Sequence, residues 1–240
     1  MIFQVGRKVS LEDEALKSLP AKDRAKWDLA YRVGNLEDPV FVHAKSVFAL
    51  KKRTEPAPEW LVYQEVFETA GKMFMRGVTA VEPEWLPVFG RGLCNFLPPV
   101  SDPEPWYDAD KGVIMCRRTG TFGLQAWPLP LLDLPYPEES EECVKLFARF
   151  LLEGKVFQTL GEFSGVLLCR PATFCKSTSF HTAPVKAFIN ALSKKAVWSR
   201  DRLLGVMKEQ PDYLKAEFKA LVPKARAKKV DDVWKELKAE

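Results

Sequence analysis

The chain has 240 residues, of which 47% are hydrophobic and 12% aromatic, and its formal net charge at pH 7 is +4. This composition indicates an ordinary globular protein with enough apolar side chains for one large domain or two small ones. No apolar run approaches the roughly 20 residues of a membrane span, and the N-terminus lacks the pattern of a secretory signal. The small basic excess is compatible with nucleic-acid binding and, equally, with an ordinary solvated surface.

The cysteines are odd in number, lie far apart and form no CxxC pair; they are Cys94, Cys116, Cys143, Cys169 and Cys175. The histidines are His43 and His181. A zinc site needs thiolates or imidazoles that cluster in the sequence, so we expect no metal site. Reduced, mostly buried thiols in an intracellular compartment are the better interpretation.

The N-terminal quarter of the chain predicts one strand between irregular segments. Residues 11–31 are rich in charge and predict a surface helix or loop. Residues 39–50, PVFVHAKSVFAL, are β-branched and aromatic, which predicts a strand. Residues 51–59 are basic and then interrupted by prolines, which predicts a loop.

Residues 60–86, WLVYQEVFETAGKMFMRGVTAVEPEWL, allow either a helix or a hairpin. Several polar side chains would share one helical face, but Gly71 and Gly77 would each cost a helix interior about 1 kcal/mol relative to alanine. Strand-forming residues dominate the segment, and KMFMR alternates with the period of two that a strand requires. We therefore predict two strands, at about 60–69 and 72–81, that turn at Ala70-Gly71.

The remainder of the chain predicts a short helix, a small hairpin and then mainly helices. Pro83 is typical of a helix start. Prolines and acidic residues gather in residues 97–111, and we place a domain boundary near residue 92. A hairpin is predicted within 111–130, and helices from about 138, where an acidic run favours a helix N-terminus. The helical pattern continues almost to the end, with interruptions at Pro211 and Pro223.

The sequence carries no recognisable motif of an enzyme. It lacks the GxxxxGK[ST] loop that binds nucleotide phosphates through backbone amides, and it lacks GxSxG and HExxH. The carboxylate pairs Glu65 with Glu68 and Glu82 with Glu84 fit exposed surface groups better than an acid–base pair. We therefore expect no catalytic residue in this chain.

The predicted hairpin is the candidate binding element, because small Greek-key barrels bind oligonucleotides with strand faces and loops. Lys72 and Arg76 would meet phosphates, beside a neighbouring strand that carries His43, Lys45 and Ser46. The alternative is that both cations only solubilise the hairpin end. Basic residues 224–229 fit a solvated face, and three aromatic residues fit a core better than a stacking platform: Tyr63, Phe67 and Phe74.

Two segments, PVFVHAKSV (39–47) and EWLVYQEVFETAGKMFMRGVTAVEPEWL (59–86), resemble the oligonucleotide-binding (OB) barrel near the C-terminus of DEAH-box RNA helicases. In that family the first segment reads like V-x-I-H-P-S-S-V, and the second like W-V-V-Y-x-E-x-x-x-T-x-K-x-Y-M-R-x-V-T. Four later segments are similar to one branch of the family: KGVIMCRR, AWPLP, FARFLLEGKVF and PDYLKAEFKALVP. That branch is the nucleolar DEAH-box helicase of small-ribosomal-subunit assembly, which has an extra C-terminal domain. The resemblance covers about residues 39–240.

The resemblance implies an α+β chain in which a small OB-fold β-barrel at 1–91 precedes a mixed, mainly α-helical domain at 92–240. It also implies RNA contacts at the matching positions, which are His43, Lys45, Ser46, Thr69, Lys72 and Arg76. The family's H-P-S-S reads H-A-K-S here, which loses the rigidity of proline and adds a lysine. The T-x-K spacing is longer by one residue, so the resemblance does not fix the place of Lys72 on the RNA path.

The implied parent protein is an ATP-dependent RNA helicase of the small-subunit processome in the nucleolus, which would release the U-three small nucleolar RNA from pre-ribosomal RNA. ATP and magnesium would bind in RecA-like motor domains N-terminal to this chain, and we expect no cofactor in the chain itself. We predict a non-catalytic region that guides single-stranded or structured RNA (pre-rRNA, snoRNA) and docks the motor domains and a ribosome-assembly activator. The alternatives are a protein-interaction module with incidental RNA contact, and a free-standing single-strand-binding protein.

Overall fold

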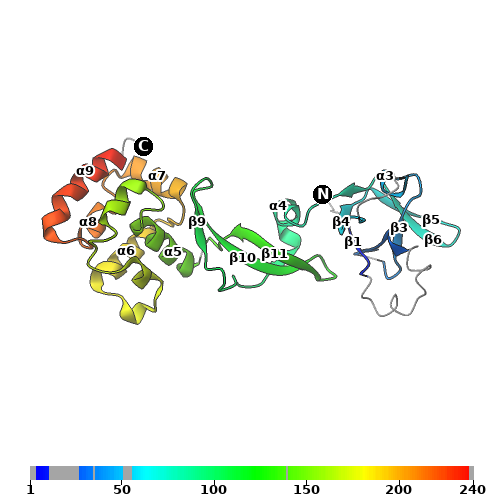
Figure 1. Ribbon diagram of the computed structural model, residues 1–240, viewed down its shortest axis with the longest axis horizontal. Helices are drawn as coiled ribbons and strands as arrows, with labels where there is room; N and C mark the ends of the chain where they lie inside the picture. The colour runs from blue at the N-terminus through cyan, green and yellow to red at the C-terminus, as the bar shows by residue number, and fades with distance from the viewer. Residues whose placement is uncertain (1–3, 11–26, 35, 51–55, 139, 238–240) are drawn as a thin grey trace. The chain divides into compact units, whose positions relative to one another are not determined.

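The computed structural model describes residues 4–10, 27–34, 36–50, 56–138 and 140–237. The chain divides into two compact units, whose elements are labelled in Figure 1. The first unit comprises residues 1–97 and 119–132, and the second comprises residues 98–118 and 133–240. The return of residues 119–132 to the first unit was not expected from the sequence, and the division near residue 92 stays a prediction.

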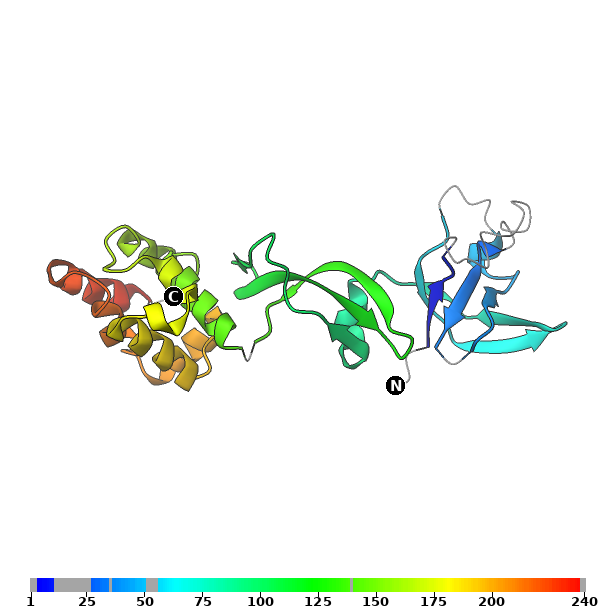
Figure 2. The ribbon, with the colours of Figure 1, turned by 90° about the horizontal axis from the view of Figure 1, so that it is seen from below.

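The first unit contains a seven-stranded sheet in the order β5-β6-β3-β2-β1-β4-β7. Its pairs are antiparallel except β3 with β6, which are parallel. The sheet is curled (Figures 1 and 2). The strands are β1 Val5–Lys8, β2 Ala30–Val33, β3 Val40–Val42, β4 Trp60–Val62, β5 Glu65–Thr69, β6 Lys72–Arg76 and β7 Thr79–Ala80.

The curl depends on two bends that lie opposite each other. The predicted strand 60–69 is interrupted at Tyr63-Gln64, and the predicted strand 72–81 is interrupted at Gly77-Val78. Gly77 has a positive φ of 64°, and the backbone N–H of Gln64 donates to the backbone carbonyl oxygen of Arg76 at 3.1 Å. Beyond the bends, β4 and β7 pair at one end of the sheet while β5 and β6 pair at the other. The same hairpin therefore supplies both edges of the sheet.

The core of this unit is formed by side chains from four strands, β2, β3, β4 and β6: Tyr31, Val33, Val40, Val42, Leu61 and Met75. All are almost fully buried, and each contributes about 1.5–3 kcal/mol by leaving water. The Tyr31 hydroxyl donates to the Pro58 carbonyl oxygen at 2.7 Å, so its polar atom is satisfied.

Two N-terminal predictions are only partly right. The strand predicted for 39–50 ends at Val42, and a helix, α3 (Val47–Leu50), follows. The reason is local, because the Ser46 hydroxyl oxygen accepts a hydrogen bond from the Phe48 amide at 3.4 Å and so favours a helix start. Residues 11–26 and 51–55 lie outside the described residues. Within the predicted surface segment 11–31, Ala30 and Tyr31 are buried strand residues, which corrects that expectation at its end.

A second sheet follows the first. The predicted short helix is present as α4 (Trp85–Phe89), and a 3-10 turn, η2 (Arg91–Leu93), leads into β8 (Cys94–Phe96). After β9 (Trp106–Asp108), the chain forms a long hairpin of β10 (Val113–Phe122) and β11 (Trp127–Pro135). β10 pairs with β11, β8 and β9. The hairpin extends five residues beyond the predicted range 111–130.

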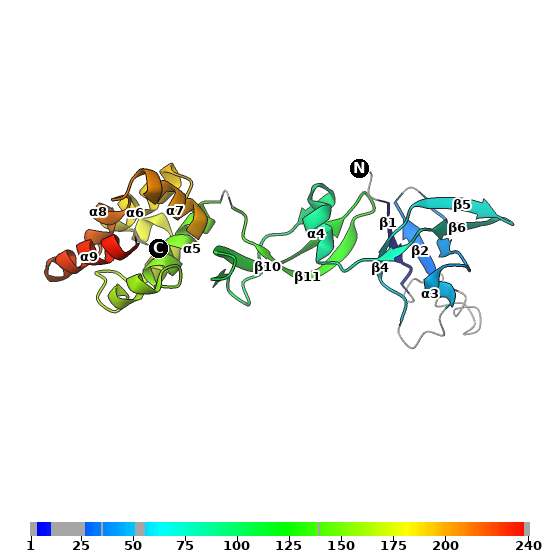
Figure 3. The ribbon, with the colours of Figure 1, turned by 90° about the horizontal axis from the view of Figure 1, so that it is seen from above.

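The rest of the second unit is helical (Figure 3). Helix α5 (Glu141–Leu152) begins where the acidic run predicts, and the Ser140 hydroxyl oxygen caps it by accepting from the Cys143 amide at 3.1 Å. The later elements are η3 Gln158–Phe163, η4 Pro171–Cys175, η5 Thr178–Phe180, α6 Ala183–Lys194, α7 Arg200–Glu209, α8 Lys215–Lys219, η6 Lys224–Arg226 and α9 Ala227–Leu237. Pro211 and Pro223 lie between helices, as predicted.

Large aromatic side chains from different helices fill the core of the helical unit. They include Phe147, Phe163, Phe174, Phe188, Phe218 and Trp234. The predicted α+β class is therefore confirmed. Among the described helices, none combines the length and apolar character that a membrane crossing requires.

Candidate nucleic-acid interface

One face of the first sheet carries a row of aromatic rings. Phe74 on β6 is the register partner of Phe41 on β3 and of Phe67 on β5, with ring centroids 6.4 Å and 6.2 Å apart. His43, just beyond β3, lies 5.4 Å from Phe67 and 6.0 Å from Phe74. Trp27 extends the row at 5.8 Å from Phe41. All five rings are half-buried.

Strand alternation explains why this row lies on the opposite face from the main core of the unit. On the face of the row, Trp27 and Phe41 pack against a smaller buried cluster of Val9 and Ala30. Val40 and Val42 flank Phe41 in β3, and Met75 follows Phe74 in β6; these three point into the core on the other face. A half-buried aromatic face opposite a filled core is an arrangement on which nucleic-acid bases stack.

Two cations flank Phe74 along β6, on either side of the row of rings that crosses the strands. Lys72 and Arg76 are two residues before and two residues after Phe74, so all three share one face of β6. The two cations are exposed and about 13 Å apart along the strand, at about 3.3 Å per residue. Lys72 forms no ion pair with another described residue. Thr69 is its register partner across the turn.

The extra residue between Thr69 and Lys72 lies in the turn. Ala70 and Gly71 have φ values of 54° and 71°, and positive φ at both central residues is the tight hairpin geometry that matches strand twist. The β5–β6 hairpin extends beyond the rest of the sheet (Figure 3). The longer T-x-x-K spacing thus leaves Lys72 in strand register, on the face that also carries Phe74.

Arg76 already has partners within the hairpin. Its guanidinium forms an ion pair with Glu65, directly opposite on β5, and lies 5.5 Å from the centre of the Phe67 ring. The hydrogen bond to Glu65 raises the pKa of Arg76 further above its ordinary value, so the side chain stays charged. A phosphate that reached Arg76 would therefore compete with a carboxylate.

His43 is held by backbone contacts at the end of β3. Its amide donates to the Met75 carbonyl oxygen at 3.0 Å, and its Nδ1 accepts from the Lys45 amide at 3.4 Å. The Lys45 side chain is exposed in the following turn. The Ser46 hydroxyl oxygen accepts from the Phe48 amide, so it serves the start of α3.

Of the predicted site residues, the structure brings four onto one face, namely His43, Thr69, Lys72 and Arg76, and it places Lys45 and Ser46 in the turn after it. Sequence reasoning missed Phe41 and assigned Phe67 and Phe74 to a core. The signal that finds Phe74 is the alternation in β6, which groups it with the two cations. Tyr63 does pack against the core, and burial raises its pKa.

The chemistry of this face is that of a binding surface. Rings can stack on bases, and Lys72 and Arg76 can contact phosphates, whereas no pair of groups is arranged for proton transfer among the residues of this face. The described residues contain no group of three or more His, Cys, Asp or Glu side chains that could hold a metal ion.

Two family models match the chain. The oligonucleotide/oligosaccharide-binding (OB) fold matches residues 1–93, and the DEAH helicase DHX37 C-terminal domain matches residues 159–238. The fold and these matches define the class of protein, an OB-fold module followed by a helical domain of the helicase type. This confirms the resemblance found in the sequence.

Two RNA helicases are similar to this chain over most of its length. The chain is 36% identical over 209 residues to the probable ATP-dependent RNA helicase DHX37 of Homo sapiens. It is 35% identical over 235 residues to the probable ATP-dependent RNA helicase kurz of Drosophila melanogaster. These alignments cover 87% and 96% of this chain, which therefore corresponds to a region of a DHX37-like DEAH-box RNA helicase. It spans about a fifth of the length of these relatives, with 18% and 19% of them covered.

Among solved structures, the chain is similar to the Escherichia coli DExH-box NTPase HrpB. The match covers 95% of this chain and 25% of that chain, with 12% sequence identity and a TM-score of 0.28. This likeness is too low to inform the interpretation of the site.

Proposed function

We propose that this chain is the RNA-guiding and partner-docking region of an ATP-dependent DEAH-box RNA helicase that acts in small-subunit ribosome biogenesis in the nucleolus. The parent protein would release the U-three small nucleolar RNA from pre-ribosomal RNA. ATP and magnesium would be bound by RecA-like motor domains outside this chain, and the chain itself would be non-catalytic. A ribosome-assembly activator protein would dock on it.

The aromatic face with the two cations that flank Phe74 is the observation that carries the RNA-guiding role. Bases that stack on Phe67 and Phe74 would each contribute about 1–3 kcal/mol, with little dependence on sequence. Lys72 and Arg76 would position phosphates on either side of Phe74. Such contacts hold a strand without reading it, which suits a helicase that must pass RNA of changing sequence.

The test is the salt dependence of binding to a labelled single-stranded RNA of about 20 nucleotides. Each phosphate contact is expected to contribute about −0.7 to the slope of log affinity against log salt for a single strand. Lys72→Ala and Arg76→Ala should each weaken binding and reduce the slope by about 0.7. Lys235→Ala in α9 removes an exposed lysine from the other unit and serves as the matched control. Binding and slope that stay unchanged in both hairpin variants would remove this face from the RNA path.

A second candidate function is protein docking with incidental RNA contact. The modest net charge of +4 favours it, because an autonomous nucleic-acid binder usually carries a larger positive balance. Affinity capture from nucleolar extract separates the two candidates when the whole chain is compared with a Lys72→Ala/Arg76→Ala double variant. Partners that are retained in full by a variant without RNA binding would favour the docking function.

A further inference from the structure

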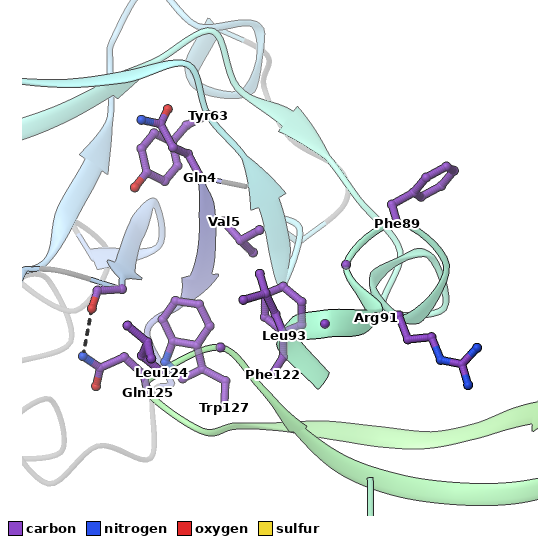
Figure 4. Close-up of a pocket in the computed structure, with 14 residues that line it drawn as sticks. Gln4, Val5, Tyr63, Phe89, Arg91, Leu93, Phe122, Leu124, Gln125 and Trp127 are labelled. Carbon is purple, nitrogen blue, oxygen red and sulfur yellow. Dashed lines mark hydrogen bonds between the residues drawn. The ribbon is translucent and has the colours of Figure 1, made fainter. Parts of the chain in front are cut away.

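A second surface of the first unit is a groove of about 790 Å³ on a different part of the fold from the aromatic face. Its walls come from the start of β1, the segment that joins α4 to η2, and the tip of the β10–β11 hairpin (Figure 4). All of its lining residues belong to the first unit. The apolar members are Val5, Tyr63, Phe89, Leu93, Phe122, Leu124 and Trp127.

Several of these side chains are unusually exposed for their type. Leu124 at the hairpin tip is 90% exposed, Phe89 is 67% exposed and Leu93 is 41% exposed. On α4, Trp85 and Val88 are also exposed and share a helical face with Phe89, because positions i, i+3 and i+4 lie together. Exposed apolar residues that gather in this way mark an interaction surface rather than an ordinary solvated one.

The charge of the groove restricts what it can bind. Arg91 is the single charged residue among those that line it, and its side chain stands at one edge, directed away from the apolar residues (Figure 4). Arg91 is exposed and forms no ion pair with another described residue. The other polar lining groups are the amides Gln4 and Gln125, and Gln125 already donates to the Gly34 carbonyl oxygen at 3.1 Å.

We propose that this groove docks a short acidic-hydrophobic peptide segment of a partner protein, whose apolar side chains fill the groove while a neighbouring carboxylate pairs with Arg91. An aromatic and aliphatic groove with one arginine at its rim has the composition of a protein-binding hot spot, whose apolar side chains lose water when the partner binds. RNA fits less well, because single-strand affinity depends on several phosphate contacts and the groove offers one cation. The inference rests on the partner-docking part of the proposed function and gives it a location.

A glycine in the wall makes the groove testable without disturbing the fold. A Cβ atom on Gly92 would meet nothing within 4 Å, and Gly92 does not need a positive φ. Gly92 lines the groove, so Gly92→Leu places a bulky apolar side chain at its wall. Arg91→Glu reverses the charge at the rim. Gly165→Leu is the matched control, since Gly165 also has open space and lies in the second unit.

The experiment pans a phage-displayed library of random peptides, about 12 residues long, against the whole chain and then measures one enriched synthetic peptide by fluorescence anisotropy. We expect enriched sequences to combine apolar residues with Asp or Glu. Affinity should fall by about tenfold or more, about 1.4 kcal/mol, in Gly92→Leu and in Arg91→Glu, and stay unchanged in Gly165→Leu. Thermal unfolding of each variant verifies the fold. Binding of the single-stranded RNA should be the same in all of these proteins.

Three results would overturn the inference: no enrichment, enriched peptides that ignore both groove variants, or peptides without acidic residues. A loss of RNA binding in Gly92→Leu would assign the groove to the RNA path instead. Capture of partners from nucleolar extract distinguishes a wrong docking site from a wrong docking function. If the wild-type chain and Gly92→Leu retain the same partners, docking stands and its site lies elsewhere. If neither retains any, the docking function itself fails.

Discussion

Arg76 shows how much the candidate RNA face depends on single residues. Its guanidinium contacts Glu65 and the Phe67 ring at the same time, so the cation is held in place but partly neutralised. Exposed ion pairs of this kind contribute only about 0.2–1 kcal/mol, which a phosphate can replace. Glu65 thus holds Arg76 ready on the face and also repels the ligand that Arg76 would bind.

Glu65→Gln is therefore expected to tighten binding of single-stranded RNA, by about two- to fivefold at low salt, because it removes a negative charge and frees Arg76. The measurement is an anisotropy titration at several salt concentrations. Glu68→Gln is the matched control, since Glu68 is exposed on the same strand but points to the other face. Equal gains in both variants would mean that only net charge matters, and weaker binding in Glu65→Gln would show that the ion pair positions Arg76 for RNA.

At this scale the sequence predicts that Lys72 and Arg76 lie together on the hairpin, as they do, whereas RNA contact at these residues stays a prediction. Lys72 and Arg76 were identified because exposed cations near a turn suit phosphate binding. Phe67 and Phe74 were assigned to a core because large aromatic side chains are more often buried than exposed. Which face of a strand is covered depends on the rest of the fold, and the alternation in β6 shows only that Phe74 shares its face with the cations.

At the scale of elements, the turn was predictable and the bends were not. Gly71 marks the hairpin because its positive φ of 71° is one that glycine adopts without cost. The break at Tyr63-Gln64 has no comparable signal in the sequence. It arises because β4 pairs with β1 and β5 pairs with β6, at opposite ends of the sheet. The helices from α5 onward were found because capping, amphipathic spacing and proline breaks are local signals.

Gly154, in the segment FARFLLEGKVF, is another glycine whose conformation the fold requires. Gly154, at φ 75°, ends α5 in a Schellman motif in which the Gly154 amide donates to Leu151 and the Lys155 amide donates to Phe150. A Cβ atom at Gly154 would also lie 2.3 Å from the Gly161 Cα. Gly154→Ala is therefore expected to lower the free energy of unfolding by about 2 kcal/mol or more, since the left-handed conformation alone costs about 1–2 kcal/mol.

Denaturant unfolding of the helical unit measures this change. Gly165→Ala is the control, because Gly165 has open space and no positive φ, and we expect it to change stability by less than about 0.5 kcal/mol. Similar losses in both variants would contradict the role given to Gly154.

Helices α8 and α9 are joined by an ion-pair cluster that gives stability a defined pH dependence. Asp231 on α9 lies 2.6 Å from Lys219 Nζ and 2.9 Å from Lys215 Nζ, both on α8. The hydrogen bonds from Lys219 and Lys215 lower the pKa of Asp231 from 3.8 to about 2. Because the pKa is lower in the folded state, the cluster stabilises the fold above pH 3.8, and this contribution is lost as the pH falls towards 2.

Wild type should therefore melt at a higher temperature than Asp231→Asn at pH 6, and the difference should vanish between pH 3.8 and about pH 2. Thermal scans across this range make the comparison. Asp232→Asn is the control, because Asp232 pairs only with Lys235 on its own helix among the described residues, and it should melt close to wild type throughout. A difference for Asp231→Asn that persists at pH 2 would exclude ionisation as its cause.

At the scale of the whole molecule, both proposed binding surfaces belong to one of the two units. The aromatic face and the docking groove both lie in the first unit, whereas the large aromatic core lies in the second. The sequence could not show that residues 119–132 belong with the first unit. A unit built from two separate stretches of chain is defined by long-range contacts, which no local sequence pattern predicts. Stability of the helical unit and RNA binding should accordingly be separable.

Leu192→Ala in α6 tests that separation. Leu192 is fully buried in the helical core, so its truncation should lower the local free energy of unfolding by about 2–5 kcal/mol. Hydrogen exchange followed by mass spectrometry reports each unit separately: peptides from α5 and α6 should lose protection, while peptides from β3 and β6 keep it. RNA affinity below the melting temperature should be unchanged. If β3 and β6 lose protection in parallel with α6, the two units unfold as one cooperative structure, and stability and RNA binding are not separable.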